Sequence, residues 1–193
     1  MKTLYLTRHA KTLFNMQHKI QGFCDSPLTK EGILQTKEAR RHIDQLGIKF
    51  DDAYCSTSER ASDTVEILTD IPYTRCKNLR EWNFGSLEGE GEYLNPPLPY
   101  NDFFVQFGGE SQKQVEHRIS NAIMSIMKKT KGKNVLIVSH GGAIANFYRH
   151  WENNSSIKRD GPIQNCSLLE YDFDGQQFKL KRIIKHDYSK IKA

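Results

Sequence analysis

The sequence predicts an α/β fold, specifically a three-layer α/β/α sandwich with a central, mostly parallel sheet. Three observations lead to this prediction. Strand-like and helix-like segments alternate along the chain. The run at 135–138 is short, unbroken and apolar, as in a parallel strand that is buried on both faces. The chain has 193 residues with no internal repeat and no long linker, so we expect one domain over residues 1–193.

The first half of the chain is predicted to supply three strands and two helices. Thr29 is placed to cap a helix whose apolar residues recur at helical spacing, and Gly47 is placed to end it. Ser56 and Glu59 have the spacing of a capping box, so we expect them to open the next helix. In chain order, the predicted elements are a strand at 2–8, a helix at 29–46, a strand at 52–56, a helix that Ser56 opens and whose inner face runs from 61 to 68, and a short strand at 73–76.

The second half begins with a segment of a different character. Residues 84–110 are rich in glycine, proline and aromatic residues, which predicts a loop or a short helical excursion. Ser111 and Gln114 form another capping-box pair ahead of an amphipathic helix. Asp174-Gly175 is a strong hairpin signal between two strand-like runs. The remaining predicted elements are a helix at 111–126, the strand at 135–138, a helix that includes 144–151, and the two strands of the hairpin.

Composition and charge exclude several classes of protein. No apolar run reaches the roughly 18 residues of a membrane span, and charge comes too early at the N-terminus for a secretory signal. The 4 cysteines lie far apart, so we expect reduced thiols and a cytoplasmic protein. The formal charge of +5 favours an anionic substrate without requiring nucleic acid. The basic stretch at 179–192 is expected to be a solvated edge strand and tail.

Chemically unusual residues stand where predicted strands end. Arg8 and His9 end the first strand, and His140 follows the most apolar one. Ligands of open α/β sheets bind beyond the carboxyl ends of the strands, so two central parallel strands would bring both histidines to one edge. Arg60 lies in the first turn of a helix that follows another strand, and Glu81 follows a fourth strand-like stretch. These five side chains can therefore converge in one cleft.

This set of side chains suits a phosphate group. Guanidinium groups donate paired hydrogen bonds to phosphate oxygens, and a neutral imidazole is a competent nucleophile. Glu81 can protonate a leaving oxygen, and the glycines after His140 let backbone amides approach an anion. Each residue alone also has a structural interpretation. A single strand-end histidine is more often structural, Arg60 could pair with a neighbouring acid, and Glu81 could be a surface carboxylate. The combination favours phosphoryl transfer.

Six short motifs occur in order between residues 3 and about 150. They are Leu6-Thr7-Arg8-His9-Ala10-Lys11-Thr12 with Asn15; Gln21-Gly22 with Asp25-Ser26-Pro27-Leu28-Thr29 and Gly32; Ser56 with Ser58-Glu59-Arg60-Ala61 and Thr64; Leu79 and Glu81 with Gly85, Glu88 and Gly89; Gly109-Glu110-Ser111 with Arg118; and Val138-Ser139-His140-Gly141-Gly142. As a set they resemble the motifs of the histidine phosphatase superfamily, whose fold is called phosphoglycerate-mutase-like. The resemblance implies that fold for this chain.

The resemblance also implies a role for each matched position. His9 would be the nucleophile that becomes phosphorylated, and Glu81 would be the general acid. The groups that bind the phosphoryl oxygens would be Arg8, Arg60 and His140, with further phosphate or substrate contacts from Asn15, Gln21, Gly22 and Gly141. No metal and no cofactor are expected, since paired arginines repel a divalent cation and supply charge stabilisation themselves.

Ala10 departs from the pattern, because it replaces the glycine that usually follows the histidine. If that position requires a positive φ or a close ligand approach, alanine is strained or crowded there. A methyl group is small, so we expect the site to be tuned and not lost.

The resemblance covers both phosphatases and mutases. Mutases are usually longer, with a middle insertion that helps to retain a bisphosphate intermediate. Here the segment between Glu81 and Ser111 is short, and Gln21-Gly22 is more similar to the phosphatase members. We therefore expect a phosphomonoester hydrolase that acts on a small phosphorylated metabolite, with cofactor-dependent phosphoglycerate mutase as the alternative. Within the insertion at 84–110, the aromatic residues of 93–107 form either a lid, a satellite hydrophobic cluster or a dimer contact.

Other classes find less support in the sequence. A cysteine phosphatase needs five residues between cysteine and arginine, and Cys55 and Arg60 have one too few. The glycine-rich nucleotide motifs and the H-E-x-x-H zinc motif are absent. A pseudoenzyme that only binds a phosphorylated ligand would be marked by loss of the arginines or histidines, and all are present. We expect no nucleic-acid or membrane partner, and either a monomer or a homodimer.

Overall fold

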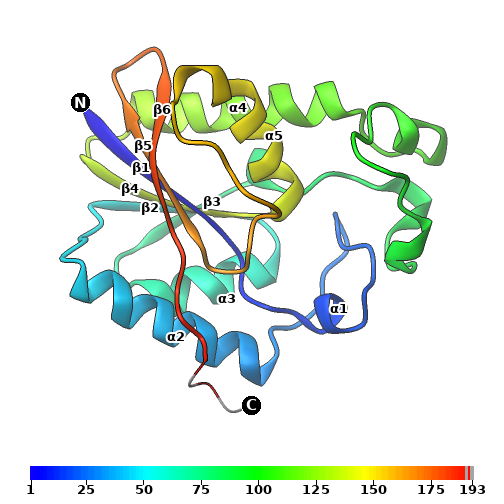
Figure 1. Ribbon diagram of the computed structural model, residues 1–193, viewed down its shortest axis with the longest axis horizontal. Coiled ribbons are helices and arrows are strands. Elements are labelled where there is room, and N and C mark those ends of the chain that lie inside the picture. Colours follow the sequence, from blue (N-terminus) through cyan, green and yellow to red (C-terminus); the bar gives the residue numbers. More distant parts are fainter. Residues whose placement is uncertain (190, 192–193) are drawn as a thin grey trace.

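The computed structural model describes residues 1–189 and 191, and within them it contains a six-stranded sheet in the order β3-β2-β4-β1-β5-β6 (Figure 1). The first four strands in this order are parallel to one another. Strand β5 is antiparallel to its neighbour β1, and β6 is antiparallel to β5. The strands are β1 (Lys2–Arg8), β2 (Asp52–Ser56), β3 (Tyr73–Cys76), β4 (Asn134–Ser139), β5 (Leu168–Phe173) and β6 (Phe178–Ile184). The α-helices are α1 (Leu13–Met16), α2 (Lys30–Gln45), α3 (Glu59–Leu68), α4 (Gln112–Lys129) and α5 (Gly141–Trp151). The predicted fold class is confirmed.

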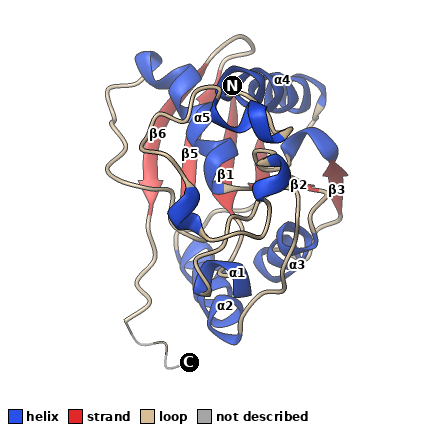
Figure 2. Ribbon diagram, turned by 90° about the vertical axis from the view of Figure 1, so that its right-hand side faces the viewer, coloured by secondary structure: helices blue, strands red, loops and turns tan. Residues whose placement is uncertain are grey.

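Helices cover both faces of the sheet, with α2 and α3 on one side and α4 and α5 on the other (Figure 2). Alternation along the strands produces this arrangement. In β4, Val135 and Ile137 join the core beneath α4 and α5, whereas Leu136 and Val138 join the core beneath α2 and α3. All four side chains are fully buried, which explains why β4 is apolar throughout instead of alternating.

Most of the predicted helix ends are confirmed. The Thr29 side chain accepts a hydrogen bond from a first-turn amide of α2, and Gly47 follows that helix at φ 69°. Ser111 and Gln114 form the reciprocal capping box of α4. The Asp174-Gly175 turn connects β5 and β6, and β6 is an edge strand as expected for the basic stretch. The last lysine of that stretch, Lys192, lies outside the described residues.

The capping box predicted for α3 is wrong. Ser58 is the N-cap residue, and its side chain makes no capping hydrogen bond. The carboxylate of Asp25 takes this place, because its Oδ2 atom accepts the Glu59 amide at 2.5 Å. The Ser56 hydroxyl instead accepts the Ser58 amide at 3.3 Å. An acid from a distant loop therefore caps the helix that carries Arg60.

The segment at 84–110 is built from short 3-10 helices and irregular backbone. Phe84 and Phe104 pack edge to face with their ring centroids 4.7 Å apart. Together with Ile20, Trp82 and Val115 they form a small core separate from the two sheet cores. The 3-10 helices of the segment at 84–110 are Gly85–Leu87, Glu92–Leu94 and Phe103–Phe107.

Candidate active site

The two predicted histidines meet at the carboxyl edge of the sheet. β1 and β4 are parallel neighbours, and Arg8 at the end of β1 is paired with Ser139 at the end of β4. The residue that follows each of these two is a histidine. The ring centroids of His9 and His140 are 5.2 Å apart. Both side chains are buried, His9 with 3% exposure and His140 with 0%. The predicted convergence is thus a direct result of parallel pairing.

The hydrogen bonds of His9 determine its tautomer. Its Nδ1 atom lies 2.8 Å from the carbonyl oxygen of Ala10, and a carbonyl oxygen only accepts, so Nδ1 carries the proton. Burial, followed by the positive charges of Arg60 and Arg8, holds the pKa of His9 well below its usual range. The ring is therefore neutral at physiological pH, with a free lone pair on Nε2. This is the protonation state that a nucleophilic histidine requires.

Ala10 is accommodated without backbone strain. It is fully buried, and it is not among the described residues with a positive φ. Its amide donates to the Thr64 hydroxyl at 2.9 Å, and its methyl group belongs to the core beneath α2 and α3. Alanine therefore fits the position at which the resemblance leads us to expect glycine.

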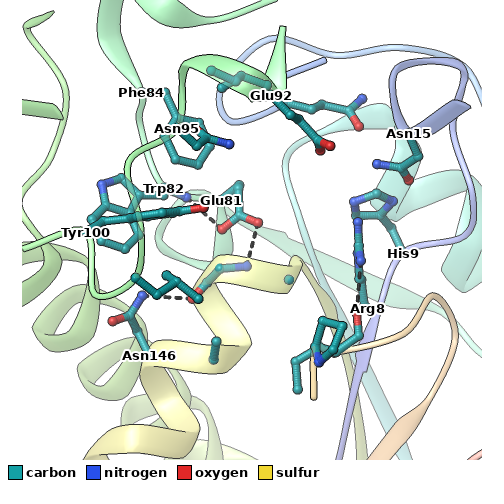
Figure 3. Close-up of a pocket in the computed structure, with 18 of the residues that line it drawn as sticks. Arg8, His9, Asn15, Glu81, Trp82, Phe84, Glu92, Asn95, Tyr100 and Asn146 are labelled. Atoms are coloured by element: carbon teal, nitrogen blue, oxygen red, sulfur yellow. Dashed lines mark hydrogen bonds between the residues drawn. The ribbon is translucent and has the colours of Figure 1, made fainter. Parts of the chain in front are cut away.

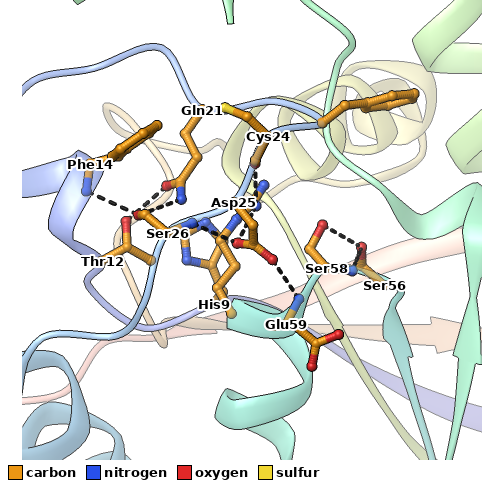
Figure 4. A network of polar contacts seen from close by, with 12 residues as sticks. His9, Thr12, Phe14, Gln21, Cys24, Asp25, Ser26, Ser56, Ser58 and Glu59 are labelled. Atoms are coloured by element: carbon orange, nitrogen blue, oxygen red, sulfur yellow. Dashed lines mark hydrogen bonds and ion pairs between the residues drawn. The ribbon is translucent and has the colours of Figure 1, made fainter. Parts of the chain in front are cut away.

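Two arginines flank the histidines, Arg8 half-buried and Arg60 fully buried. Arg8 donates from Nη1 to the carbonyl of Ile163 at 2.9 Å. Arg60, with 0% exposure, donates to the carbonyls of Gly22 and Cys24 and pairs with Asp25 at 2.8 Å. These contacts fix both guanidinium groups while leaving part of each without a partner. Figure 4 shows the Asp25 carboxylate with its contact to the Glu59 amide.

Several buried nitrogens around His9 have no hydrogen-bond partner. They are the Nε atoms of Arg8 and Arg60 and both ring nitrogens of His140. Leaving a buried donor unsatisfied costs roughly 1–3 kcal/mol, and more for a charged group. Such a cluster is therefore explained best by an anionic ligand that accepts these hydrogen bonds.

Glu81 lies at the N-terminus of α5. Its carboxylate accepts the amides of Gly142 at 2.8 Å, Ala143 at 2.7 Å and Trp82 at 2.8 Å. A Cβ atom at position 142 would lie 2.8 Å from the Glu81 carboxylate, so glycine permits this close approach. The side chain faces His9 across the cavity (Figure 3).

A cavity of about 340 Å³ opens above these residues. Such a volume is at the small end of the range for ligand pockets, roughly 300–1,000 Å³. The residues that line it are Arg8, His9, Asn15, Lys19, Ile20, Gln21, Glu81, Trp82, Phe84, Glu92, Asn95, Leu98, Tyr100, Gly141, Gly142, Ala145, Asn146, Arg159, Pro162 and Ile163. Arg60 and His140 lie in the buried layer behind His9 and are not part of this lining.

The other predicted contact residues behave differently from one another. Asn15 and Gly141 line the cavity. Gln21 also lines it, but its amide group is held by the hydroxyls of Thr12 and Ser26, each at 2.8 Å. Gly22 does not line it, because its amide donates to Glu88 and its carbonyl accepts from Arg60. Gly22 thus holds Arg60 in place and offers no amide to a ligand.

Part of the cavity was not anticipated from the sequence. The short helix α1 is capped by Thr12 and Asn15, which have the capping spacing but stand outside any apolar repeat. Asn165 donates to the carbonyl of His9 at 2.7 Å, and Arg159 lines the rim; both lie in the irregular chain between α5 and β5. Glu92 comes from the insertion. No regular pattern marks these positions.

Of the aromatic residues in 93–107, only some face the cavity. Tyr100 lines it, whereas Phe103 and Phe104 pack into the small core. Tyr93 is 86% exposed. The segment therefore combines a cavity wall with a satellite hydrophobic cluster.

Within 1–189 and 191, no helix is long and apolar enough to cross a membrane. In the same part of the chain, no three His, Cys, Asp or Glu side chains are grouped as metal ligands.

The fold and the paired histidines define a class of enzyme. Over residues 4–185 the sequence matches the histidine phosphatase superfamily (branch 1), and the chain belongs to this superfamily. It is accordingly an enzyme of the phosphatase or mutase type.

Individual relatives represent both activities. The metal-independent phosphoserine phosphatase of Arabidopsis thaliana is 30% identical over 181 residues, which cover 86% of this chain and 74% of the relative. A phosphoglycerate mutase from Bacillus anthracis superimposes with a TM-score of 0.81 at 26% identity, covering 93% and 91% of the two chains. A mutant phosphoserine phosphatase from Entamoeba histolytica, in complex with phosphoserine, gives 0.75 at 25% identity, covering 95% and 96%.

Proposed function

We propose that the protein is a phosphomonoesterase that hydrolyses a small phosphorylated metabolite through a phosphohistidine on His9. The observation that carries this proposal is the group of unpartnered buried donors around a neutral histidine. The Nε atoms of Arg8 and Arg60 and the one protonated ring nitrogen of the neutral His140 would each gain an acceptor from a phosphoryl group.

The reaction would proceed in two displacements. The free lone pair on His9 Nε2 attacks phosphorus, the new N–P bond forms, and the P–O bond to the alcohol breaks. Glu81 gives the departing oxygen its proton. Water then attacks phosphorus, the N–P bond breaks, and Glu81 takes back a proton from that water. Arg8, Arg60 and His140 stabilise the charge on the phosphoryl oxygens in both steps.

Two further residues complete the proposed site. The side-chain Nδ2 atom of Asn15 makes no hydrogen bond within the described chain and is available to a phosphoryl oxygen or the substrate. Gly141 lines the cavity beside the Arg8 guanidinium. A Cβ atom at position 141 would lie 3.4 Å from Arg8 Nε, so glycine leaves room for a ligand there. Gln21 supports the wall of the cavity through its bonds to Thr12 and Ser26.

Hydrolysis is favoured over mutase activity by the form of the insertion. A mutase must retain a bisphosphate while it turns over in the site, whereas here the outer wall carries Glu92, which repels a second phosphate. The relatives named as phosphoserine phosphatases point the same way. Phosphoglycerate mutase activity remains the second candidate because of the similarity to the Bacillus anthracis enzyme.

A panel of phosphomonoesters with para-nitrophenyl phosphate tests the proposal, with 3-phosphoglycerate isomerisation measured on the same enzyme. We expect hydrolysis by the wild type and none by His9→Ala. His117→Ala, which changes an exposed histidine on α4, is the matched control and should keep full activity. Isomerisation without hydrolysis would establish the mutase, and no reaction of either kind would favour a pseudoenzyme.

A further inference from the structure

The two ends of the cavity have opposite hydrogen-bonding character. At the floor, the unpartnered donors lie on Arg8, which lines the cavity, and on Arg60 and His140 in the buried layer next to it. The outer wall instead carries an acceptor. The Glu92 carboxylate makes no hydrogen bond within the described residues. A ligand that satisfies both ends must accept hydrogen bonds at one end and donate them at the other.

Glu92 is held at its position by the backbone. Its amide donates to the carbonyl of His18 at 2.7 Å, and neighbouring bonds join Ile20 to Gly89 and Glu90. The segment that carries Glu92 is thus tied to the 18–20 strand-like stretch. Its carboxylate points into the cavity between Glu81 and Asn15 (Figure 3). Among the described residues, the Nδ1 atom of His18 lies 3.6 Å from this carboxylate; the His18 side chain is 83% exposed and that of Glu92 is 46% exposed. The negative charge of Glu92 also acts on Arg8.

The charge of Glu92 acts on the interior of the cavity. The pKa of Tyr100 is raised, first by burial and then by the negative charges of Glu92 and Glu81. The rings of Tyr100 and Trp82 pack edge to face at 5.6 Å and form the adjoining wall. Carboxylates beside aromatic rings make an environment that favours an organic cation.

We propose that Glu92 binds an ammonium group on the substrate, so that the hydrolysed ester is the phosphate of a small amino alcohol. This inference rests on the proposed phosphatase function and adds the class of its leaving group. The phosphoryl end lies on the arginines and His9, and the ammonium end donates to Glu92. An anionic leaving group would be repelled by Glu92, whereas an ammonium group is attracted to it.

Two cations also lie on the rim, and they refine the class. The Lys19 ammonium lies 5.3 Å from the ring centroid of Phe14, and Arg159 donates to the carbonyl of Gly161. Either cation can bind a carboxylate of the substrate, and this leaves Glu92 available to the substrate's ammonium group. Amino alcohols with a carboxylate therefore belong to the class, and so do those without one. The required element is the ammonium group.

Matched pairs of substrates isolate that group. 2-Aminoethyl phosphate and n-propyl phosphate have the same shape and differ in the ammonium; O-phosphoserine and 3-phosphooxypropanoate provide a second pair. The wild type should prefer the ammonium member of each pair by about tenfold or more in kcat/KM, the value of one hydrogen bond to a charged group. Glu92→Gln should bring the preference close to one, because kcat/KM falls more for the ammonium member of each pair than for its partner. Glu90→Gln, an exposed charge change two residues away, should keep the preference.

Three results separate this inference from the function beneath it. A wild-type preference below about twofold in both pairs overturns the ammonium site, and so does a preference that survives in Glu92→Gln. In either case hydrolysis itself still supports the phosphatase. Absence of hydrolysis of every ester, including para-nitrophenyl phosphate, overturns the function and the inference together.

Discussion

Glu88 provides a quantitative test of how the site is held together. Its carboxylate accepts four backbone amides: Oε2 accepts those of Gly22 at 2.9 Å and Cys24 at 3.0 Å, and Oε1 accepts those of Phe23 at 2.7 Å and Phe84 at 3.0 Å. The carbonyls of Gly22 and Cys24 in turn accept from Arg60. One side chain therefore fixes the loop that positions a buried guanidinium group.

The structure determines the size of the effect of each substitution. Glu88→Ala removes all four bonds, and at about 1 kcal/mol each the free energy of unfolding should fall by about 4 kcal/mol. Glu88→Gln keeps one carbonyl oxygen, which satisfies two of the amides, so the loss should be about 2 kcal/mol. For a chain of this length these losses correspond to decreases in Tm of roughly 8–16 °C and 4–8 °C.

Urea unfolding followed by far-ultraviolet circular dichroism measures both losses. The exposed Glu90→Gln is the control for removal of a charge from the same loop and should change stability by less than about 0.5 kcal/mol. The account is supported if Glu88→Ala loses more stability than Glu88→Gln, and Glu88→Gln loses more than the control. If both Glu88 variants match the control, Glu88 does not hold the loop. The kcat/KM of both variants should fall together with stability, because Arg60 loses its support.

Three further predictions concern chemistry and pH. Glu81→Gln should lower kcat/KM about 100-fold for alkyl phosphates and less than tenfold for para-nitrophenyl phosphate, whose leaving group needs no acid; equal losses would count against the proton-donor role. Excess EDTA should leave the rate unchanged, and a loss that added metal restores would contradict the metal-free mechanism. Burial lowers the pKa of His186 to about 4, so the unfolded state binds more protons between about pH 6.5 and 4, and stability should fall as pH falls through this window. His186→Gln should flatten this decline in urea titrations, and an unchanged slope would show that other groups cause it.

The layout of the sheet could be predicted because local patterns determine it. The fully apolar β4 and the strand-end positions of His9 and His140 require no knowledge of the rest of the chain. Once two strands are parallel neighbours, their carboxyl ends share an edge, and the histidines meet. The helix caps at Thr29 and Ser111 were also predictable, since each acts within one turn of its own helix.

Contacts between distant loops could not be predicted in this way. Asp25 caps α3 and pairs with Arg60 across 35 residues, so the nearby Ser56 and Glu59 gave a plausible but wrong capping box. Gly22 was expected to bind phosphate, yet the carboxylate of Glu88 engages its amide. In both cases a carboxylate from far along the chain satisfies the backbone.

The outer wall of the cavity escaped prediction for a related reason. Glu92, Tyr100 and Arg159 lie in irregular segments, where neither helical nor strand periodicity marks which side faces inward. The edge of the sheet that carries the two histidines follows from elements with a regular periodicity, whereas the outer wall follows from loop conformation. Sequence therefore indicated the reaction class more clearly than the substrate.

Trapping the covalent intermediate tests the phosphohistidine most directly. The enzyme would be mixed with para-nitrophenyl phosphate, quenched within milliseconds in base, digested, and its peptides mapped by mass spectrometry beside those of His9→Ala. We predict an acid-labile phosphoryl group on His9 that forms at least as fast as turnover and is missing from the variant. A phosphoryl group on another residue, or continued turnover by His9→Ala, would contradict the mechanism.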